Sequence, residues 1–195
     1  MLDGIRKGVR NLVQGGQSDA GPVVSFVLVV YDMPRQAENT TRSLMTDYQL
    51  DVVATDYEVL IVENESGNHM DAAFIDSLPA EFSYHLRKED QPPPIHAINY
   101  GIEHARGENV CVMIDGARLL TPGVVKNTLL GHKLSELSIV TVPGYHLGHE
   151  LQQKAVGSGY DENTEKALMD SIGWPENGYN LFDIAWFSGS GALGL

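Results

Sequence analysis

The sequence predicts an α/β sandwich in which a mostly parallel central sheet carries helices on both faces. Three observations predict this fold class. Short β-branched runs recur along the chain, segments with helical spacing of apolar residues separate them, and most of the runs lack apolar–polar alternation. Strands that alternate with helices need crossover connections, and these connections are right-handed.

The first half of the chain contains three predicted strands. Residues 23–30 are an almost continuous β-branched run, which is typical of a strand buried on both faces. In the third strand, the large apolar residues Phe82, Tyr84 and Leu86 alternate with polar residues. We therefore expect one face of this strand to be more exposed than the other. The elements expected here are a strand over 23–30, a helix over 37–48, a strand over 57–62, a short helix over 73–78 and a strand over 82–86.

The second half continues the alternation as far as residue 142. Ile95, Ile98 and Ile102 form a helical stripe, and Gly107 is expected near its end. Thr121 followed by proline is typical of a helix cap and first helical position. The elements expected here are a helix over 95–105, a strand over 110–114, a helix from 121 to about 137, a fifth strand over 138–142 and a helix over 162–172.

Residues 1–21 are expected to be separate from a domain that covers residues 22–195. Basic residues interrupt a helical spacing of apolar ones, which predicts a short amphipathic helix. This helix could pack on its own domain, on a partner or on a membrane surface. The glycine-rich stretch from Gly15 to Gly21 is expected to be a flexible linker. The apolar positions are Leu2, Ile5, Val9, Leu12 and Val13, and the basic ones are Arg6, Lys7 and Arg10.

Composition excludes several classes of protein. The chain has 195 residues and a net charge of −13, which argues against a nucleic-acid partner. The lone Cys111 excludes a disulfide framework and a four-cysteine zinc site. No apolar run approaches the roughly 20 residues that span a bilayer, and residues 1–11 lack the apolar core of a secretion signal. We therefore expect a cytoplasmic chain without a transmembrane segment; its oligomeric state stays open.

Polar side chains follow the predicted strands. Ligands of open α/β sheets bind beyond the carboxyl ends of the strands, so these side chains are candidates for a binding site. The alternative stays open that they are ordinary loop and cap residues. In order, they are Tyr31 and Asp32, Glu63 and Asn64, Asp115 and Arg118, and His146 with His149.

The chemistry of these residues suits a nucleoside and a pyrophosphate. The oxygens of Glu63 and Asn64 can accept hydrogen bonds from a base N–H or a ribose hydroxyl. A diphosphate on an acidic protein needs a countercharge. Asp115 could ligate Mg²⁺ or Mn²⁺, or Arg118 could bind the phosphate oxygens directly.

Four blocks of sequence occur in a regular order over residues 22–145. They are the first strand at 24–32, Ile-Val-Glu-Asn-Glu-Ser at 61–66, Asn-Tyr-Gly-Ile with Ala-Arg-Gly-Glu between 99 and 108, and Ile-Asp-Gly-Ala-Arg at 114–118 followed by Thr-Pro-Gly. In order and spacing, these blocks resemble family-2-type glycosyltransferases of the GT-A fold. That family has an acidic motif at the second strand and an Asp-x-Asp metal motif at the fourth.

The resemblance implies a nucleotide-diphosphosugar transferase that moves a sugar from a nucleotide-diphosphate donor to an acceptor, which the sequence does not identify. It implies inversion at the anomeric carbon, with a carboxylate as general base. It places Tyr31 against the base, Glu63 in contact with the base, and Asp115 at the ribose and a divalent cation, Mn²⁺ or Mg²⁺. Together with the residues that follow the predicted strands, the predicted donor-binding set is Tyr31, Asp32, Glu63, Asn64, Asn99, Asp115 and Arg118.

Three departures from the family pattern bear on activity. Ala117 replaces the second acid of the metal motif, so Arg118 could substitute electrostatically or His146 or His149 could join Asp115 as a metal ligand. Asn64 replaces an acid of the second-strand motif. No Gly-Gly-Phe-Asp-Glu-like acceptor segment occurs up to Leu195.

The missing acceptor segment leaves the catalytic base unassigned. It could lie among Glu150, Asp161, Glu162 and Glu165, or the acceptor part of the domain could be lacking. A catalytically inactive nucleotide-sugar-binding module of the same fold is therefore the alternative function. A different α/β enzyme, such as a nucleotidyltransferase, is a third interpretation.

Overall fold

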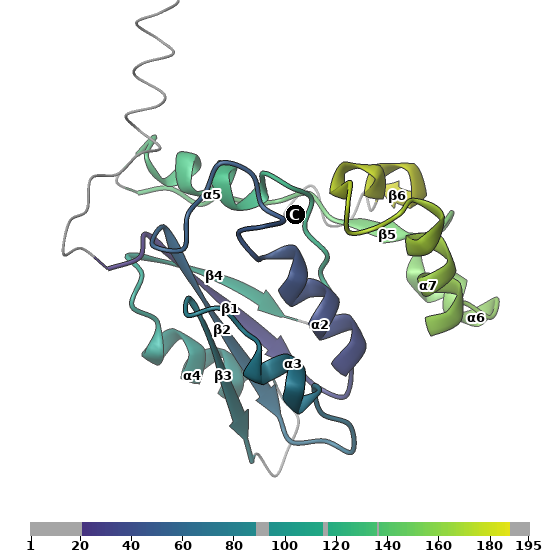
Figure 1. The fold of residues 1–195 in the computed structure, drawn as a ribbon, viewed down its shortest axis with the longest axis horizontal. Helices are drawn as coiled ribbons and strands as arrows, with labels where there is room; N and C mark the ends of the chain where they lie inside the picture. The colour runs from purple at the N-terminus through teal and green to yellow at the C-terminus, as the bar shows by residue number, and fades with distance from the viewer. Residues whose placement is uncertain (1–20, 89–93, 115–116, 136, 188–195) are drawn as a thin grey trace, which may run out of the picture. The chain divides into compact units, whose positions relative to one another are not determined.

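A computed structural model describes residues 21–88, 94–114, 117–135 and 137–187 (Figure 1). They belong to two compact units, one up to Leu119 and one from Leu120 onward, and each unit is described by itself. The predicted amphipathic segment at residues 1–20 and the candidate ligand Asp115 lie outside the described residues. Among the helices of the described part, none is both long enough and apolar enough to cross a bilayer.

The first unit is built on a parallel sheet. Within the described residues this sheet has four strands in the order β3-β2-β1-β4, and every neighbouring pair is parallel. The predicted α/β class with a mostly parallel central sheet is therefore confirmed. The strands are β1 (Val24–Val30), β2 (Tyr57–Asn64), β3 (Phe82–Arg87) and β4 (Asn109–Ile114), and the helices between them are α2 (Pro34–Ser43), α3 (Ala72–Asp76) and α4 (Ile95–His104).

The two central strands form the core of the sheet. Every residue of β1 and β2 is buried, as their continuous apolar runs predict. Phe26 of β1 meets Tyr57 of β2 edge-to-face, with ring centroids 5.8 Å apart. The Tyr57 hydroxyl donates to the carbonyl of Leu44 at 2.5 Å, which ties the sheet to the end of α2. Burial, and next the carboxylate of Glu81, raises the pKa of this phenol well above its usual range.

Helix α2 begins and ends earlier than the sequence predicted. The expected helix covered residues 37–48, whereas α2 begins with Pro34 at its first position and ends at Ser43. Proline has no N–H to lose and a helical φ, so it suits this position. Residues 45–50 form turns that Gln49 closes by donating to the carbonyl of Ser43 at 2.6 Å.

Helix α4 lies on one side of the sheet, and α2 and α3 lie on the other (Figure 1). A single glycine lets α4 approach closely. A Cβ added at Gly101 would stand 2.2 Å from Cγ1 of Val27 on β1. Beside it, buried Ala97 packs against Val27, Val29 and Val62. Gly101 of the Asn-Tyr-Gly-Ile block therefore serves packing between α4 and the sheet.

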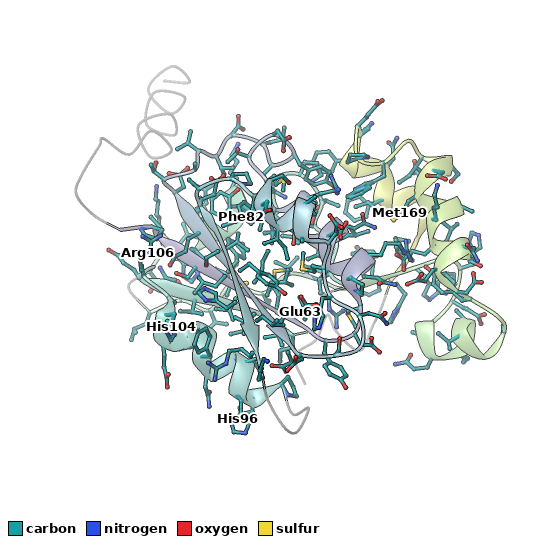
Figure 2. All side chains as sticks on the ribbon, turned by 60° about the horizontal axis from the view of Figure 1, so that its bottom comes forward. Glu63, Phe82, His96, His104, Arg106 and Met169 are labelled. Carbon is teal, nitrogen blue, oxygen red and sulfur yellow. The ribbon has the colours of Figure 1, made fainter. Side chains whose placement is uncertain are left out.

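The Ala-Arg-Gly-Glu block lies at the amino edge of the sheet, where it completes a polar cluster. Arg106 binds the carboxylate of Glu58 through its backbone N–H at 2.6 Å, Nε at 2.7 Å and Nη2 at 2.6 Å. Ser25 donates to the same carboxylate at 2.6 Å and accepts from the N–H of Gly107 at 2.8 Å. Ser25, Glu58, Arg106 and Gly107 are called the amino-edge cluster below. Figure 2 shows Arg106 and Glu63 at opposite ends of the strands.

Burial and hydrogen bonding act in opposite directions on Glu58. Burial alone would raise the pKa of this carboxyl, but the hydrogen bonds from Ser25 and Arg106 outweigh it, and the pKa is lowered. The amino-edge cluster is therefore a charged structural link between β1, β2 and the residues that lead into β4.

The second unit departs most from the predicted pattern. The fifth strand expected at 138–142 is wrong, because these residues form no strand. An apolar run becomes a strand only where a neighbour supplies hydrogen bonds and burial, and Ile139 is 92% exposed. The elements of this unit are α5 (Val124–His132), β5 (Tyr145–Leu147), α6 (Gln152–Gly157), α7 (Glu162–Ser171), the 3₁₀ helix η1 (Gly178–Ile184) and β6 (Ala185–Phe187).

Two helices in the second unit, α5 and α7, test predicted helix positions. The expectation that Thr121 caps α5 is wrong, since Gly123 is the cap residue, with a left-handed φ of 95° that favours glycine. Helix α7 confirms the helix expected at 162–172. Asp161 caps α7 by accepting from the N–H of Thr164 at 2.8 Å.

Candidate functional site

The carboxyl ends of β1 and β2 bring the first two predicted pairs of site residues together. Val30 stands opposite Glu63 in the parallel register, so Tyr31 and Asp32 leave β1 next to the end of β2. Side chains alternate along a strand, so the last two residues of β2, Glu63 and Asn64, face opposite sides of the sheet. Glu63 lies on the side of Tyr84 and α3, and Asn64 lies on the side of Arg87 and α4.

Glu63 is a fully buried carboxylate. Its Oε2 accepts from the Tyr84 hydroxyl at 2.5 Å, and both oxygens lie 3.3 Å from the N–H of Met70. His69 Nδ1 lies 3.8 Å from Oε1. These partners occupy the carboxylate, and its relative exposure is 0%. Glu63 therefore holds the loop after β2 in place and presents no accessible surface to a ligand in this arrangement.

The contact with Glu63 also affects the pKa of Tyr84. Burial, followed by the hydrogen bond to Glu63, raises the pKa of the phenol well above its usual range. The hydroxyl therefore stays protonated at neutral pH, as a hydrogen-bond donor must. The sequence pattern predicts Tyr84 on the third strand but assigns it no role. The alternation of Phe82, Tyr84 and Leu86 was the signal that could have assigned its face.

The loop after β2 is also tied to the loop after β1. Asn68 donates from Nδ2 to Oδ1 of Asp32 at 2.8 Å, and Asp32 adopts a left-handed φ of 53°. Ser66 closes a turn by accepting from the N–H of Asn68 at 3.2 Å. The Tyr31 ring is nearly half exposed beside this link. An accessible aromatic ring next to a carboxylate is suited to stack on a base and to accept from a ribose hydroxyl.

Two further contacts fix this loop to the helices. Asp71 caps α3 by accepting from the N–H of Phe74 at 2.9 Å, while its own N–H donates to Glu38 of α2 at 3.2 Å. The guanidinium of Arg42 lies 4.6 Å from the centroid of the Phe74 ring. Residues 65–71 are therefore held at both ends by α2, α3 and the strands.

Asn64 is the unusual residue of this edge. Its relative exposure is 3%, and its Oδ1 is buried without a hydrogen-bond partner. Leaving a buried acceptor unpaired costs about 1–3 kcal/mol, so such atoms are rare away from functional positions. This oxygen is an acceptor at the end of a parallel strand, where α/β proteins bind ligands. It can take an N–H or O–H donor.

The segment after β4 is only partly described. Asp115 and Gly116 lie outside the described residues, so no position is assigned to the predicted metal ligand. Ala117 and Arg118 are exposed, and the N–H of Arg118 donates to Oγ1 of buried Thr40 on α2 at 2.9 Å. The guanidinium of Arg118 is thus carried on a backbone anchored to α2.

Asn99 faces away from the sheet, and His146 belongs to the second unit. Asn99 is exposed on α4 and lies half a turn away from the buried pair Ala97 and Gly101, so it faces away from the sheet. His146 was expected after a fifth strand of the central sheet. That strand is wrong, and His146 lies within β5 of the second unit, opposite Trp186 of β6. His149 is exposed in the same unit.

No metal site is formed by the part of the chain that the structure describes. The described residues include no group of three or more His, Cys, Asp or Glu that could hold a metal ion. The donor set expected for Mn²⁺ or Mg²⁺ depends on Asp115, which lies outside that part. Asp115, with His146 or His149 as a further ligand, therefore stays a prediction for this cation.

Comparison with known proteins assigns no family. No family model matches the sequence. No curated protein sequence matches it either. Thirty-one chains of solved structures are similar. One is the crystal structure of S. aureus TarS 1–349, with a TM-score of 0.49 and 16% sequence identity over 65% of this chain and 41% of that chain. This chain thus spans less than half of the TarS chain, and at this TM-score the likeness assigns no residue and no activity.

Proposed function

We propose that this chain binds a nucleotide-diphosphate sugar at the carboxyl edge of β1 and β2 and acts as a glycosyltransferase. The observation that carries the proposal is the buried, unpartnered Oδ1 of Asn64. A nucleobase offers ring or exocyclic N–H donors, and pairing one of them with this oxygen would recover the free energy that the unpaired atom costs. The four sequence blocks with their order supply independent support.

The neighbouring residues suit the rest of a nucleoside. Tyr31 offers an accessible ring for the base, and the free lone pairs of Asp32 suit a ribose hydroxyl. Asn64 is 3% exposed in this structure, so a nucleotide reaches its Oδ1 only when side chains at the carboxyl edge rearrange.

The diphosphate needs a countercharge in this acidic chain. Arg118 is an exposed guanidinium on an anchored backbone and can bind phosphate oxygens directly. A divalent cation, Mn²⁺ or Mg²⁺, held with Asp115 would neutralise the same charge. His146 remains a predicted additional ligand. These alternatives differ in one respect, because only the second is lost on chelation.

The transfer itself follows from the chemistry of a donor of this kind. The acceptor hydroxyl oxygen attacks the anomeric carbon on the face opposite the diphosphate, while the bond from that carbon to the diphosphate oxygen breaks. The nucleoside diphosphate leaves with the electron pair, and a carboxylate takes the hydroxyl proton, so the centre inverts. Asp161 is a poor candidate for this base, because its hydrogen bonds as the α7 cap, first from the backbone N–H of Thr164, lower its pKa. Glu150, Glu162 and Glu165 remain predicted candidates.

Thermal unfolding with a panel of nucleoside diphosphates tests the proposal. A ligand at about 100 times its Kd stabilises the folded state by about 2.7 kcal/mol, which raises the Tm by several degrees. Arg118→Ala should abolish the shift if the arginine binds the diphosphate, and Lys154→Ala is the matched control, since Lys154 is exposed on α6 of the second unit. Loss of the shift with EDTA or with Asp115→Ala assigns the countercharge to the cation. No shift with any nucleotide, with or without Mn²⁺, contradicts the proposal.

Ala117 favours a second candidate function, a binding module without activity. An alanine cannot ligate a cation, so the second acid of the metal motif is missing. This candidate gives the same thermal shift as the enzyme but releases no free nucleotide from a sugar donor. Release of nucleotide that Arg118→Ala or Asp115→Ala suppresses would exclude it.

A further inference from the structure

On the side of the sheet that carries α4, one helix is too narrow to cover all four strands. Four strands spaced about 4.8 Å apart present a width of about 15–20 Å, whereas one helix covers about 10 Å. Among the described residues of this unit, α4 is the helix on that side. Tyr100 and His104 of α4 lean toward β3, where Tyr100 bonds to His85 at 3.1 Å and stacks on His104. The uncovered part is therefore at the other edge, over β4.

An apolar surface occupies this uncovered edge. On β4, Val110, Val112 and Ile114 stand opposite Ser25, Val27 and Val29 of β1, so they share the α4 side of the sheet. On α4, Ile95 and Ile102 lie on the flank opposite to His104, which places them toward β4. We name this surface the β4 patch. Its members are Ile95, Ile102, Val110, Val112 and Ile114, and their relative exposure is 37–51%.

The geometry points to residues 2–13 of this same chain as the cover of the β4 patch. Their sequence carries Leu2, Ile5, Val9, Leu12 and Val13 at helical spacing, the pattern of an element that buries one apolar face. Twelve residues in a helix measure about 18 Å, and the six residues of β4 measure about 20 Å. The lengths of the segment and of the patch therefore match.

The point at which the chain enters the sheet supports this cover. The N–H of Glu108 donates to the carbonyl of Pro22, and the N–H of Asn109 donates to the carbonyl of Val23, so the chain begins its described course beside the start of β4. Residues 14–20 connect this point to the segment and reach about 23–25 Å when extended. The connection is therefore long enough for the segment to reach any part of the β4 patch.

The charges of residues 2–13 and of the residues around the β4 patch also support this docking. Residues 2–13 carry Arg6, Lys7 and Arg10 against one acid, within a chain of net charge −13. Exposed Glu103 adjoins Ile102 on α4, and exposed Glu108 precedes β4. A basic amphipathic segment over an acidic-rimmed apolar strip gains from both burial and charge attraction. This docking is independent of nucleotide binding at the opposite, carboxyl edge.

A nitroxide label on the full chain tests the docking. The label is placed at Asn11→Cys, on the polar side of the segment, in a Cys111→Ala background, and the isoleucine methyl signals are observed by NMR. Docking predicts strong broadening of Ile102 and Ile114, and little effect on Ile75 of α3 on the other side of the sheet. Ile5→Asp with Val9→Asp should restore the Ile102 and Ile114 signals, whereas Gln14→Asp with Gln17→Asp, which adds the same charge outside the apolar positions, should leave the broadening intact.

Three results overturn the inference. Equal broadening with and without the Ile5→Asp and Val9→Asp changes means that the segment does not dock through its apolar face. Broadening of an unlabelled, methyl-observed chain by a separate nitroxide-labelled chain means that a second copy covers the patch. Broadening that appears only on vesicles of phosphatidylcholine and phosphatidylserine means that the segment serves a membrane surface.

Discussion

The hydroxyl of Tyr84 donates to the buried carboxylate of Glu63 at 2.5 Å and thereby joins β3 to β2 at the carboxyl edge of the sheet. The same carboxylate receives the N–H of Met70, from the loop that follows β2. One buried charge thus fixes two strands and one loop. The shape of the candidate nucleotide edge depends on this contact, although Glu63 itself is inaccessible in the free chain.

Replacing Tyr84 with Phe should destabilise the protein strongly. A hydrogen bond to a charged group contributes about 1.5–3 kcal/mol, and its loss leaves a buried carboxylate short of a donor. The free energy of unfolding in urea should fall by about that amount. Tyr145→Phe, which removes a hydroxyl from a residue that is 43% exposed in the second unit, should change it by less than about 0.5 kcal/mol. Equal effects of the two substitutions would show that Glu63 does not need Tyr84.

Acid should weaken the protein partly through Glu58. Its pKa is lowered in the folded state, so its contribution to stability is full above the unfolded pKa, near 4.3, and is lost as the pH falls through the folded pKa. Glu58→Gln should lower the free energy of unfolding at neutral pH and flatten its decline below about pH 4. Glu103→Gln on the surface of α4 is the control. An acid decline that is as steep in Glu58→Gln as in the unmodified chain would exclude this role of the amino-edge cluster.

Gly101 and Gly157 should respond oppositely to alanine. A Cβ at Gly101 would stand 2.2 Å from Val27, and overpacking of this kind costs about 1–3 kcal/mol. That cost exceeds the gain of up to about 1 kcal/mol from helix propensity. Gly157 of α6 has no atom within 4 Å of the added Cβ, so alanine there should be neutral or stabilising. Chemical denaturation of the two variants measures both effects, and a stable Gly101→Ala protein would contradict the close packing of α4 on β1.

Substitutions of Asn64 should affect the Tm of the free chain and the nucleotide-induced Tm shift differently. Asn64→Leu replaces a buried, unpaired acceptor with an apolar group of similar size, so the Tm of the free chain should stay level or rise. The same variant should lose the nucleotide-induced shift. Asn64→Asp keeps an acceptor oxygen and should retain the shift, with a lower Tm because it buries an unpaired charge. A full nucleotide shift in Asn64→Leu would remove Asn64 from the site.

The sequence predicted the sheet because β1 and β2 are buried on both faces, and such strands carry continuous β-branched runs. The run at 138–142 has a similar composition and forms no strand, since strand formation depends on a partner that composition does not reveal. His146 was assigned to the sheet edge through that strand. Its placement in β5 removes the basis of that assignment.

The candidate site was predictable only in part. The position of Glu63 at a strand end follows from the sequence pattern, and so does its nearness to Asp32. Its burial does not, because it depends on Tyr84, 21 residues away on a strand whose register is set by tertiary packing. The unpartnered state of Asn64 is likewise a property of the folded chain.

Diffraction from crystals soaked in a nucleotide-diphosphate sugar tests the central claim most directly. We expect density for the base beside Tyr31 and within hydrogen-bond distance of Asn64, with the diphosphate extending toward the residues after β4. Density for an ordered nucleotide at any other place on the chain would contradict the account, and so would an empty edge at a concentration that raises the Tm in solution.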